Sequence, residues 1–200
     1  MQRGRVFTLF VLFIALFLPL IAVWIETKSS YNHSLTSLAL QGISRSYDLA
    51  IERSRPAKEG QIFTLSNTIP MIDDSGKRRD FTFEVTIDME AITFNLPMTL
   101  ALLIAIVAIF GAKRWEIVAY GLGLLLMLHL ISIALFILCT LTQISKANPY
   151  LAFYLGRHYL ADGFLCALKD FLINYAARFE PFLIALYAWV AIRRHQRSRG

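Results

Sequence analysis

The stretch Phe94–Leu141, FNLPMTLALLIAIVAIFGAKRWEIVAYGLGLLLMLHLISIALFILCTL, holds two apolar runs separated by a short charged turn. The first run ends at Ala112, and the second begins at Ile117. Lys113 and Arg114 stand between them. Each run has roughly the 20 residues that an α-helix needs to cross the hydrocarbon core of a bilayer. We therefore expect an antiparallel pair of transmembrane helices here.

The composition of the whole chain agrees with a membrane protein. Hydrophobic residues make up 56% of the 200 residues and charged residues 17%, and the mean hydropathy is +0.54. A soluble domain has a smaller apolar fraction and more charge. The net charge of +6 comes largely from basic residues beside the apolar runs, not from one basic module. We therefore expect membrane lipid as a partner and no nucleic acid.

Two further runs bring the expected number of transmembrane helices to four. Val6–Ile25 follows a basic N-terminus and is too long for the core of a signal peptide, so we expect an uncleaved helix. Tyr175–Ile192 is less apolar, but a dense basic tail follows it, as after a helix that ends in the cytoplasm. The N-terminus, the 113–116 turn and the tail hold eight basic residues and one acidic residue, Glu116. Both termini are therefore expected in the cytoplasm.

Residues 26–93 show a pattern typical of a small folded segment outside the membrane. Apolar and polar residues alternate from Phe81 to Glu90, and β-forming residues are frequent from Gln61 to Ile69. With turn residues at 73–77 between them, these two stretches predict a β-hairpin. Residues 34–54 read as an amphipathic helix.

The alternation places five apolar side chains on one face of the second predicted strand. That face is either part of a small core or a docking edge for a partner, and it consists of Phe81, Phe83, Val85, Ile87 and Met89.

The predicted fold is thus a membrane all-α bundle of four transmembrane helices with a small α+β extracytoplasmic segment that contains a β-hairpin. Residues 143–174 are amphipathic, and they form either an interfacial helix on the outer leaflet or a cover over the bundle. The expected divisions of the chain are 1–25, 26–93, 94–142, 143–174 and 175–200.

Motifs that would indicate an enzyme are missing. The sequence has no Gly-x-Ser-x-Gly, His-Glu-x-x-His or phosphate-binding loop. Cys139 and His129 are about 15 Å apart along one helix, too far for a nucleophile and its base. We expect Cys139 and Cys166 to be small buried apolar residues rather than a pair. No catalytic residue, cofactor or metal is predicted.

Four polar residues in or near the apolar runs are candidates for functional contacts. His129 lies in the middle of the third run, where an ionisable group is costly. It is either functional or a neutral imidazole that bonds to a neighbouring helix, with Ser132 one turn away. Arg178 and Glu180 lie near the start of the last run. Arg178 can extend to the headgroups, and Glu180 could pair with a cation of a partner.

Three stretches of the chain resemble the exosortase H-associated membrane proteins of bacteria. They are the strand and helix from Phe83 to Leu103, the helix that ends at Leu141-Thr142-Gln143, and Tyr154 to Pro181 followed by Trp189 and a basic end. The resemblance implies a bacterial inner (plasma) membrane protein beside an exosortase. Exosortases are multi-pass membrane transpeptidases that cut a C-terminal sorting signal with their own Cys, Arg and His, so the resemblance brings no catalytic residues to this chain.

The function expected from these patterns is a non-catalytic accessory role in an exosortase-type protein-sorting system. The protein would stabilise the enzyme or present its substrate, for example by pairing a strand with an extended tail. A small transporter or channel component is an alternative, although the runs offer few polar residues besides His129, Ser132 and Thr140. A stand-alone membrane enzyme that uses a cysteine is the third hypothesis.

Overall fold

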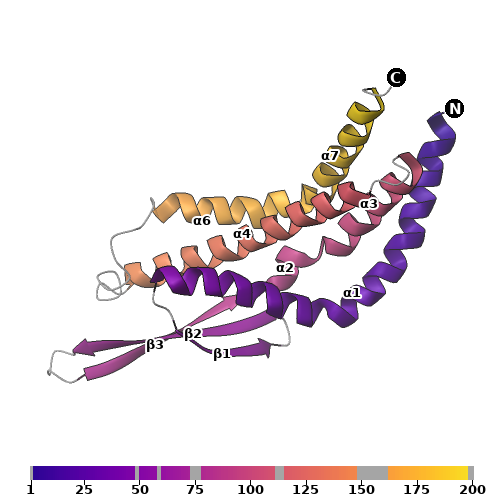
Figure 1. Ribbon diagram of the computed structural model, residues 1–200. Coiled ribbons are helices and arrows are strands. Elements are labelled where there is room, and N and C mark those ends of the chain that lie inside the picture. Colours follow the sequence, from indigo (N-terminus) through magenta and orange to yellow (C-terminus); the bar gives the residue numbers. More distant parts are fainter. Residues whose placement is uncertain are drawn as a thin grey trace. The chain divides into compact units, whose positions relative to one another are not determined.

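The structure is a computed structural model, and it describes residues 2–47, 50–57, 60–72, 78–110, 115–147 and 162–197 (Figure 1). The chain divides into two compact units. Unit 1 comprises Met1–Tyr31, Thr93–His129 and Asn174–Gly200, and unit 2 comprises Asn32–Ile92 and Leu130–Ile173.

Four helices within the described ranges are long and apolar enough to cross a membrane, which confirms the predicted number of apolar helices. The candidate spans are Gly4–Ile43, Met89–Phe110, Trp115–Ile144 and Gly163–Arg194. They fall on helices α1 (Gln2–Tyr47), α2 (Met89–Thr93) with α3 (Leu96–Phe110), α4 (Trp115–Ala147), and α6 (Asp162–Phe171) with α7 (Ala177–Arg197). A π-helix, η1 (Leu172–Ala176), connects α6 to α7.

Helix α1 is longer than the first apolar run. It continues through Ile25 to Tyr47, because no proline and no glycine other than Gly42 follows in this part of the chain. The amphipathic helix predicted over 34–54 is therefore the end of α1 as far as Tyr47. Its assignment to residues 50–54 was wrong, since these belong to strand β1 (Ala50–Ala57). Pro56 fits such a strand, because β1 lies at an edge of the sheet.

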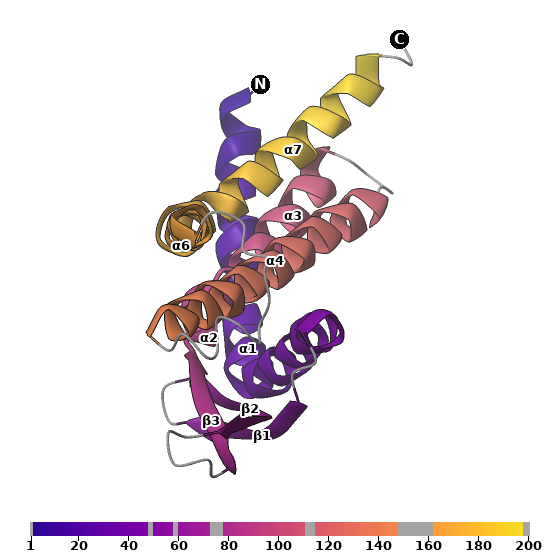
Figure 2. The same cartoon turned by 90° about the vertical axis from the view of Figure 1, so that its left-hand side faces the viewer.

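Unit 2 contains an antiparallel sheet in the order β1-β2-β3, with β2 (Gly60–Ile72) in the centre and β3 (Arg78–Ile87) at the other edge (Figure 2). In the β2–β3 register Phe63 is opposite Val85. Strand β3 ends at Ile87, so the prediction that the alternation continues as strand to Glu90 was wrong. The predicted turn at 73–77 lies outside the described residues.

The proposed docking face of the second predicted strand is described only in part. Ile87 and Met89 are completely buried, and Thr36 of α1 donates a hydrogen bond to the Met89 sulfur at 3.3 Å. Both residues are therefore core residues of unit 2. The side chains of Phe81, Phe83 and Val85 lie outside the described residues, and their docking role remains a prediction.

Asp88 lies between the end of strand β3 and the start of helix α2. Its Oδ1 accepts hydrogen bonds from the backbone N–H of Glu90 at 3.1 Å and of Ala91 at 3.2 Å, which makes Asp88 the N-cap of α2.

We expect Asp88→Ala to lower the free energy of unfolding by about 1 kcal/mol, because two N–H groups of α2 lose their acceptor. Asp88→Asn keeps an acceptor oxygen and should retain most of the stability. Denaturant titration of the purified chain in detergent measures both variants, and an unchanged midpoint for Asp88→Ala would show that the cap is dispensable.

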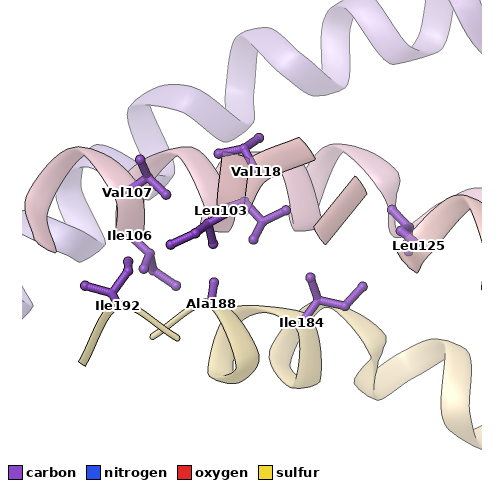
Figure 3. Close-up of a cluster of buried hydrophobic side chains, with 9 residues drawn as sticks. Leu103, Ile106, Val107, Val118, Leu125, Ile184, Ala188 and Ile192 are labelled. Carbon is purple, nitrogen blue, oxygen red and sulfur yellow. The ribbon is translucent and has the colours of Figure 1, made fainter. Parts of the chain in front are cut away.

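The apolar core of unit 1 joins α3, α4 and α7. Figure 3 shows side chains of α7 pointing toward those of α3, with α4 residues completing the cluster. The buried members are Leu103, Ile106, Val107, Ile117, Val118, Leu125, Ile184, Ala188 and Ile192. The predicted antiparallel pair α3–α4 is thus joined by the last helix.

The two cysteines form a disulfide in unit 2, so the prediction that they do not pair was wrong. Cys139 of α4 and Cys166 of α6 are bonded, with their Cα atoms 5.1 Å apart. The 27-residue separation corresponds to no recognisable spacing, and the contact arises only because α6 returns along α4. Beside it, Lys169 lies 5.5 Å from the centre of the Phe136 ring.

Candidate functional site: a buried polar cluster around Asn95

His129 has hydrogen-bond partners on two other elements of unit 1. It is completely buried in α4. Its Nδ1 lies 2.9 Å from the hydroxyl of Tyr31 in α1, and its Nε2 lies 2.9 Å from Oδ1 of Asn95, in the turn between α2 and α3. The ring of Trp24 meets the Tyr31 ring edge-on, with centroids 5.2 Å apart. His129 thus connects α1 to the α2–α3 turn.

Asn95 is the central residue of this cluster. It is completely buried, and its backbone carbonyl accepts the N–H of Thr99 at 2.9 Å, the first hydrogen bond of α3. Pro97 is the second residue of α3. Its missing N–H breaks no hydrogen bond, because the N–H groups of the first turn have no acceptor within the helix. The Asn95 side chain is therefore held at a helix start while its amide faces α4 and α7.

A proline in α7 explains one contact of the Asn95 amide. In a regular α-helix the carbonyl of Ala177 would accept the N–H of residue 181, but Pro181 has none. Asn95 Nδ2 donates to this carbonyl at 3.1 Å instead. A freed carbonyl in a membrane helix needs such a donor from a neighbouring element. Asn95 replaces the hydrogen bond that Pro181 removes.

Glu180 completes the cluster from α7. Only 4% of the residue is exposed. Its Oε2 accepts a short hydrogen bond from Asn95 Nδ2 and lies 3.8 Å from His129 Nε2. We predicted that Glu180 could pair with a cation of a partner, and its observed contacts are within the chain. We call Tyr31, Asn95, His129 and Glu180 the Asn95 cluster.

The other two predicted polar residues lie elsewhere. Ser132 is buried, in the part of α4 that belongs to unit 2, and the hydrogen bonds of the His129 ring go to Tyr31 and Asn95 instead. Arg178 is exposed on α7, next to exposed Phe179. This placement is compatible with the predicted extension of Arg178 toward headgroups.

Sequence reasoning missed the residues that hold the cluster together. Asn95 was used only to mark a helix start, and Tyr31 was assigned to the segment beyond the first span. The available signal was an asparagine inside an apolar span together with a proline in another, since each leaves polar atoms that need partners in lipid.

The chemistry open to the described residues is that of hydrogen bonding and proton binding. Both cysteines of the chain are in the disulfide, so no thiol is free. Across the described ranges, no group of three or more His, Cys, Asp or Glu side chains could hold a metal ion. The candidate site is therefore an acid and an imidazole that both bond to the Asn95 amide, with the phenol of Tyr31 bonded to the imidazole.

Comparisons with known proteins identify the family. A family model described as "Exosortase H-associated membrane protein" matches residues 4–164, well over half of the chain. No match is found among curated proteins or among solved structures. The match covers the first two stretches of the resemblance and residues 154–164 of the third. The chain belongs to the family of exosortase H-associated membrane proteins.

Proposed function

We propose that this protein is a non-catalytic accessory subunit of an exosortase-type protein-sorting system in the bacterial inner membrane. The observation that carries the proposal is the family match over residues 4–164. Four candidate spans are compatible with a role beside a multi-pass membrane enzyme. The partner is then the exosortase, and the chain contributes contacts to the complex but no reacting group.

The site chemistry favours this proposal over the two alternatives. A cysteine enzyme needs a free thiolate, and both thiols are in the Cys139–Cys166 disulfide. A transporter needs polar groups that face a pathway, whereas the polar atoms of His129 and Asn95 bond to partners inside unit 1.

The disulfide supports an orientation with both termini in the cytoplasm. Disulfides persist in oxidising compartments and not in the bacterial cytoplasm. Cys139 near the end of α4 and Cys166 in α6 would then face the periplasm. The start of α4, beside the basic 113–114 turn, would lie on the cytoplasmic side, as the distribution of basic residues predicts.

We expect both cysteines to be inaccessible to a maleimide polymer in unreduced membranes and to react after reduction. Denaturing electrophoresis without reductant measures this as a mobility shift. Cys139→Ser leaves Cys166 free and should react without reduction. If unreduced wild-type protein reacts at both cysteines, the disulfide and the orientation argument fail together.

The sheet of unit 2 offers a way to hold a substrate. Strands β1 and β3 are the edges of a three-stranded antiparallel sheet, and an edge strand can pair its backbone with an extended peptide. The resemblance implies an exosortase substrate that ends in a sorting signal, and such pairing would hold this tail extended. The predicted docking residues Phe81, Phe83 and Val85 belong to β3.

Co-purification tests the association. The tagged chain is co-expressed with the exosortase of the same cell and purified in mild detergent, with an unrelated four-helix membrane protein as the control. Enrichment of the exosortase over this control supports the proposal. Recovery of equal amounts of exosortase with both tagged proteins would contradict the proposal.

Deletion of this protein separates the two accessory roles. If it stabilises the enzyme, the amount of exosortase falls and cleavage falls in proportion. If it presents the substrate, the amount of exosortase is unchanged while cleavage of the sorting signal slows. Unchanged enzyme level and unchanged cleavage would contradict both roles.

A further inference from the structure

The Asn95 cluster contains a buried acid, Glu180, beside an imidazole. Its ionisable members are Tyr31 from α1, His129 from α4 and Glu180 from α7, and Asn95 of the α2–α3 turn is uncharged. Within the described part of the chain, His129 is the basic group at ion-pair distance from Glu180. The protonation of His129 therefore decides the charge of the cluster.

The hydrogen-bond directions make Nε2 of His129 a donor, and a neutral imidazole satisfies all of them. The Ala177 carbonyl can only accept, so Nδ2 of Asn95 must face it and Oδ1 must face His129. Nε2 of His129 then carries a hydrogen and donates to Oδ1. A neutral ring leaves Nδ1 as the acceptor for the Tyr31 hydroxyl. A doubly protonated ring would donate to Tyr31 and deprive that hydroxyl of its acceptor.

A neutral His129 leaves a charged Glu180 uncompensated. The carboxyl is almost completely buried inside a candidate span, where an isolated charge is unfavourable and a group without a counter-charge becomes neutral instead. The hydrogen bond from Asn95 Nδ2 serves the neutral acid as well as the carboxylate, because either form has an acceptor oxygen.

We propose that the Asn95 cluster is a proton-binding site, in which Glu180 is a carboxylic acid at neutral pH and His129 is its neutral neighbour. Binding of the proton holds α7 against the α2–α3 turn, since the neutral acid keeps its bond to Asn95 without a buried charge. Release of the proton places a negative charge in the bundle and loosens this contact. The proposal goes beyond the accessory role and does not depend on it.

Infrared spectroscopy of the purified full chain in liposomes tests the protonation state. The difference spectrum between wild type and Glu180→Gln at neutral pH should show the loss of one protonated-carboxyl stretching band. Glu116→Gln is the matched control, because Glu116 is exposed at the start of α4, and it should leave the protonated-carboxyl band in place. Loss of a carboxylate band in Glu180→Gln would overturn the proposal.

The pH dependence of stability gives a second readout on the same proteins. The folded chain keeps a proton that the unfolded chain releases at mildly acidic pH, so wild-type stability should fall as the pH rises from mildly acidic values until the folded acid also loses its proton. Glu180→Gln, which imitates the neutral acid, should keep its melting temperature over that range. The two melting curves should therefore separate with rising pH, and parallel curves would count against the proposal. Neither measurement requires the exosortase, so this inference and the accessory role can fail separately.

Discussion

Replacing Asn95 by leucine is expected to lower the free energy of unfolding by about 3 kcal/mol. The side chain makes hydrogen bonds to the Ala177 carbonyl, to Glu180 and to His129. Leucine has a similar size but offers none of them. A polar contact between membrane helices contributes about 0.6 kcal/mol on average, and a buried group left without a partner costs about 1–3 kcal/mol. The expected loss is larger than that of three average polar contacts. It lies at the lower end of the cost of leaving three buried groups without partners.

Detergent-induced unfolding, followed by tryptophan fluorescence and circular dichroism, measures this loss. Phe94→Ala is the matched control, because Phe94 is adjacent in the chain and 48% exposed, so it should change stability little. If Asn95→Leu unfolds at the same detergent fraction as the control, the cluster does not hold unit 1 together.

Replacing Gly121 by leucine should have a comparable effect through packing. A Cβ at Gly121 would lie 2.8 Å from Leu103 Cδ1, closer than non-bonded carbon atoms approach, and 3.2 Å from Ile184 Cγ2, which is tighter than most such contacts. Leu103 is completely buried, so its side chain can shift only by displacing neighbours in a close-packed core. Overpacking of a core typically costs 1–3 kcal/mol. The leucine side chain is expected to lower the free energy of unfolding by about 3 kcal/mol, because it pushes α3, α4 and α7 apart.

Gly123 gives a matched control on the same helix. It is exposed, and no atom lies within 4 Å of a Cβ built there. Gly123→Leu should be neutral or slightly stabilising, because leucine favours a helix more than glycine does. A thermal melt monitored by circular dichroism should separate the two variants. Equal melting temperatures would mean that the helices tolerate a wider spacing at Gly121.

The apolar helices were predictable because length and composition suffice to identify a membrane span. The runs Phe94–Ala112 and Ile117–Leu141 correspond to α3 (Leu96–Phe110) and α4 (Trp115–Ala147). Helix α2 lies before the first run and was not predicted. The end of α1 was not predictable in this way. The polar residues after Ile25 suggested a boundary, yet a helix can leave the membrane without a break when no residue interrupts it.

The contacts of the candidate site depend on tertiary structure that periodicity does not contain. His129 stood out because an imidazole in an apolar run is unusual. Its partners Tyr31 and Asn95 are 98 and 34 residues away in sequence, and no local pattern relates them. Cys139 and Cys166 likewise gave no signal, because their approach depends on how α6 returns along α4.

The exchange of hydrogen bonds at Ala177 makes positions 95 and 181 mutually dependent in evolution. With a proline at 181, an amide at 95 is needed to occupy the Ala177 carbonyl. A residue at 181 that has an N–H could donate to the Ala177 carbonyl itself, so that an amide at 95 would no longer be needed for this hydrogen bond. The order of substitutions then matters: loss of Asn95 first leaves the Ala177 carbonyl without its donor, whereas replacement of Pro181 first keeps that carbonyl satisfied.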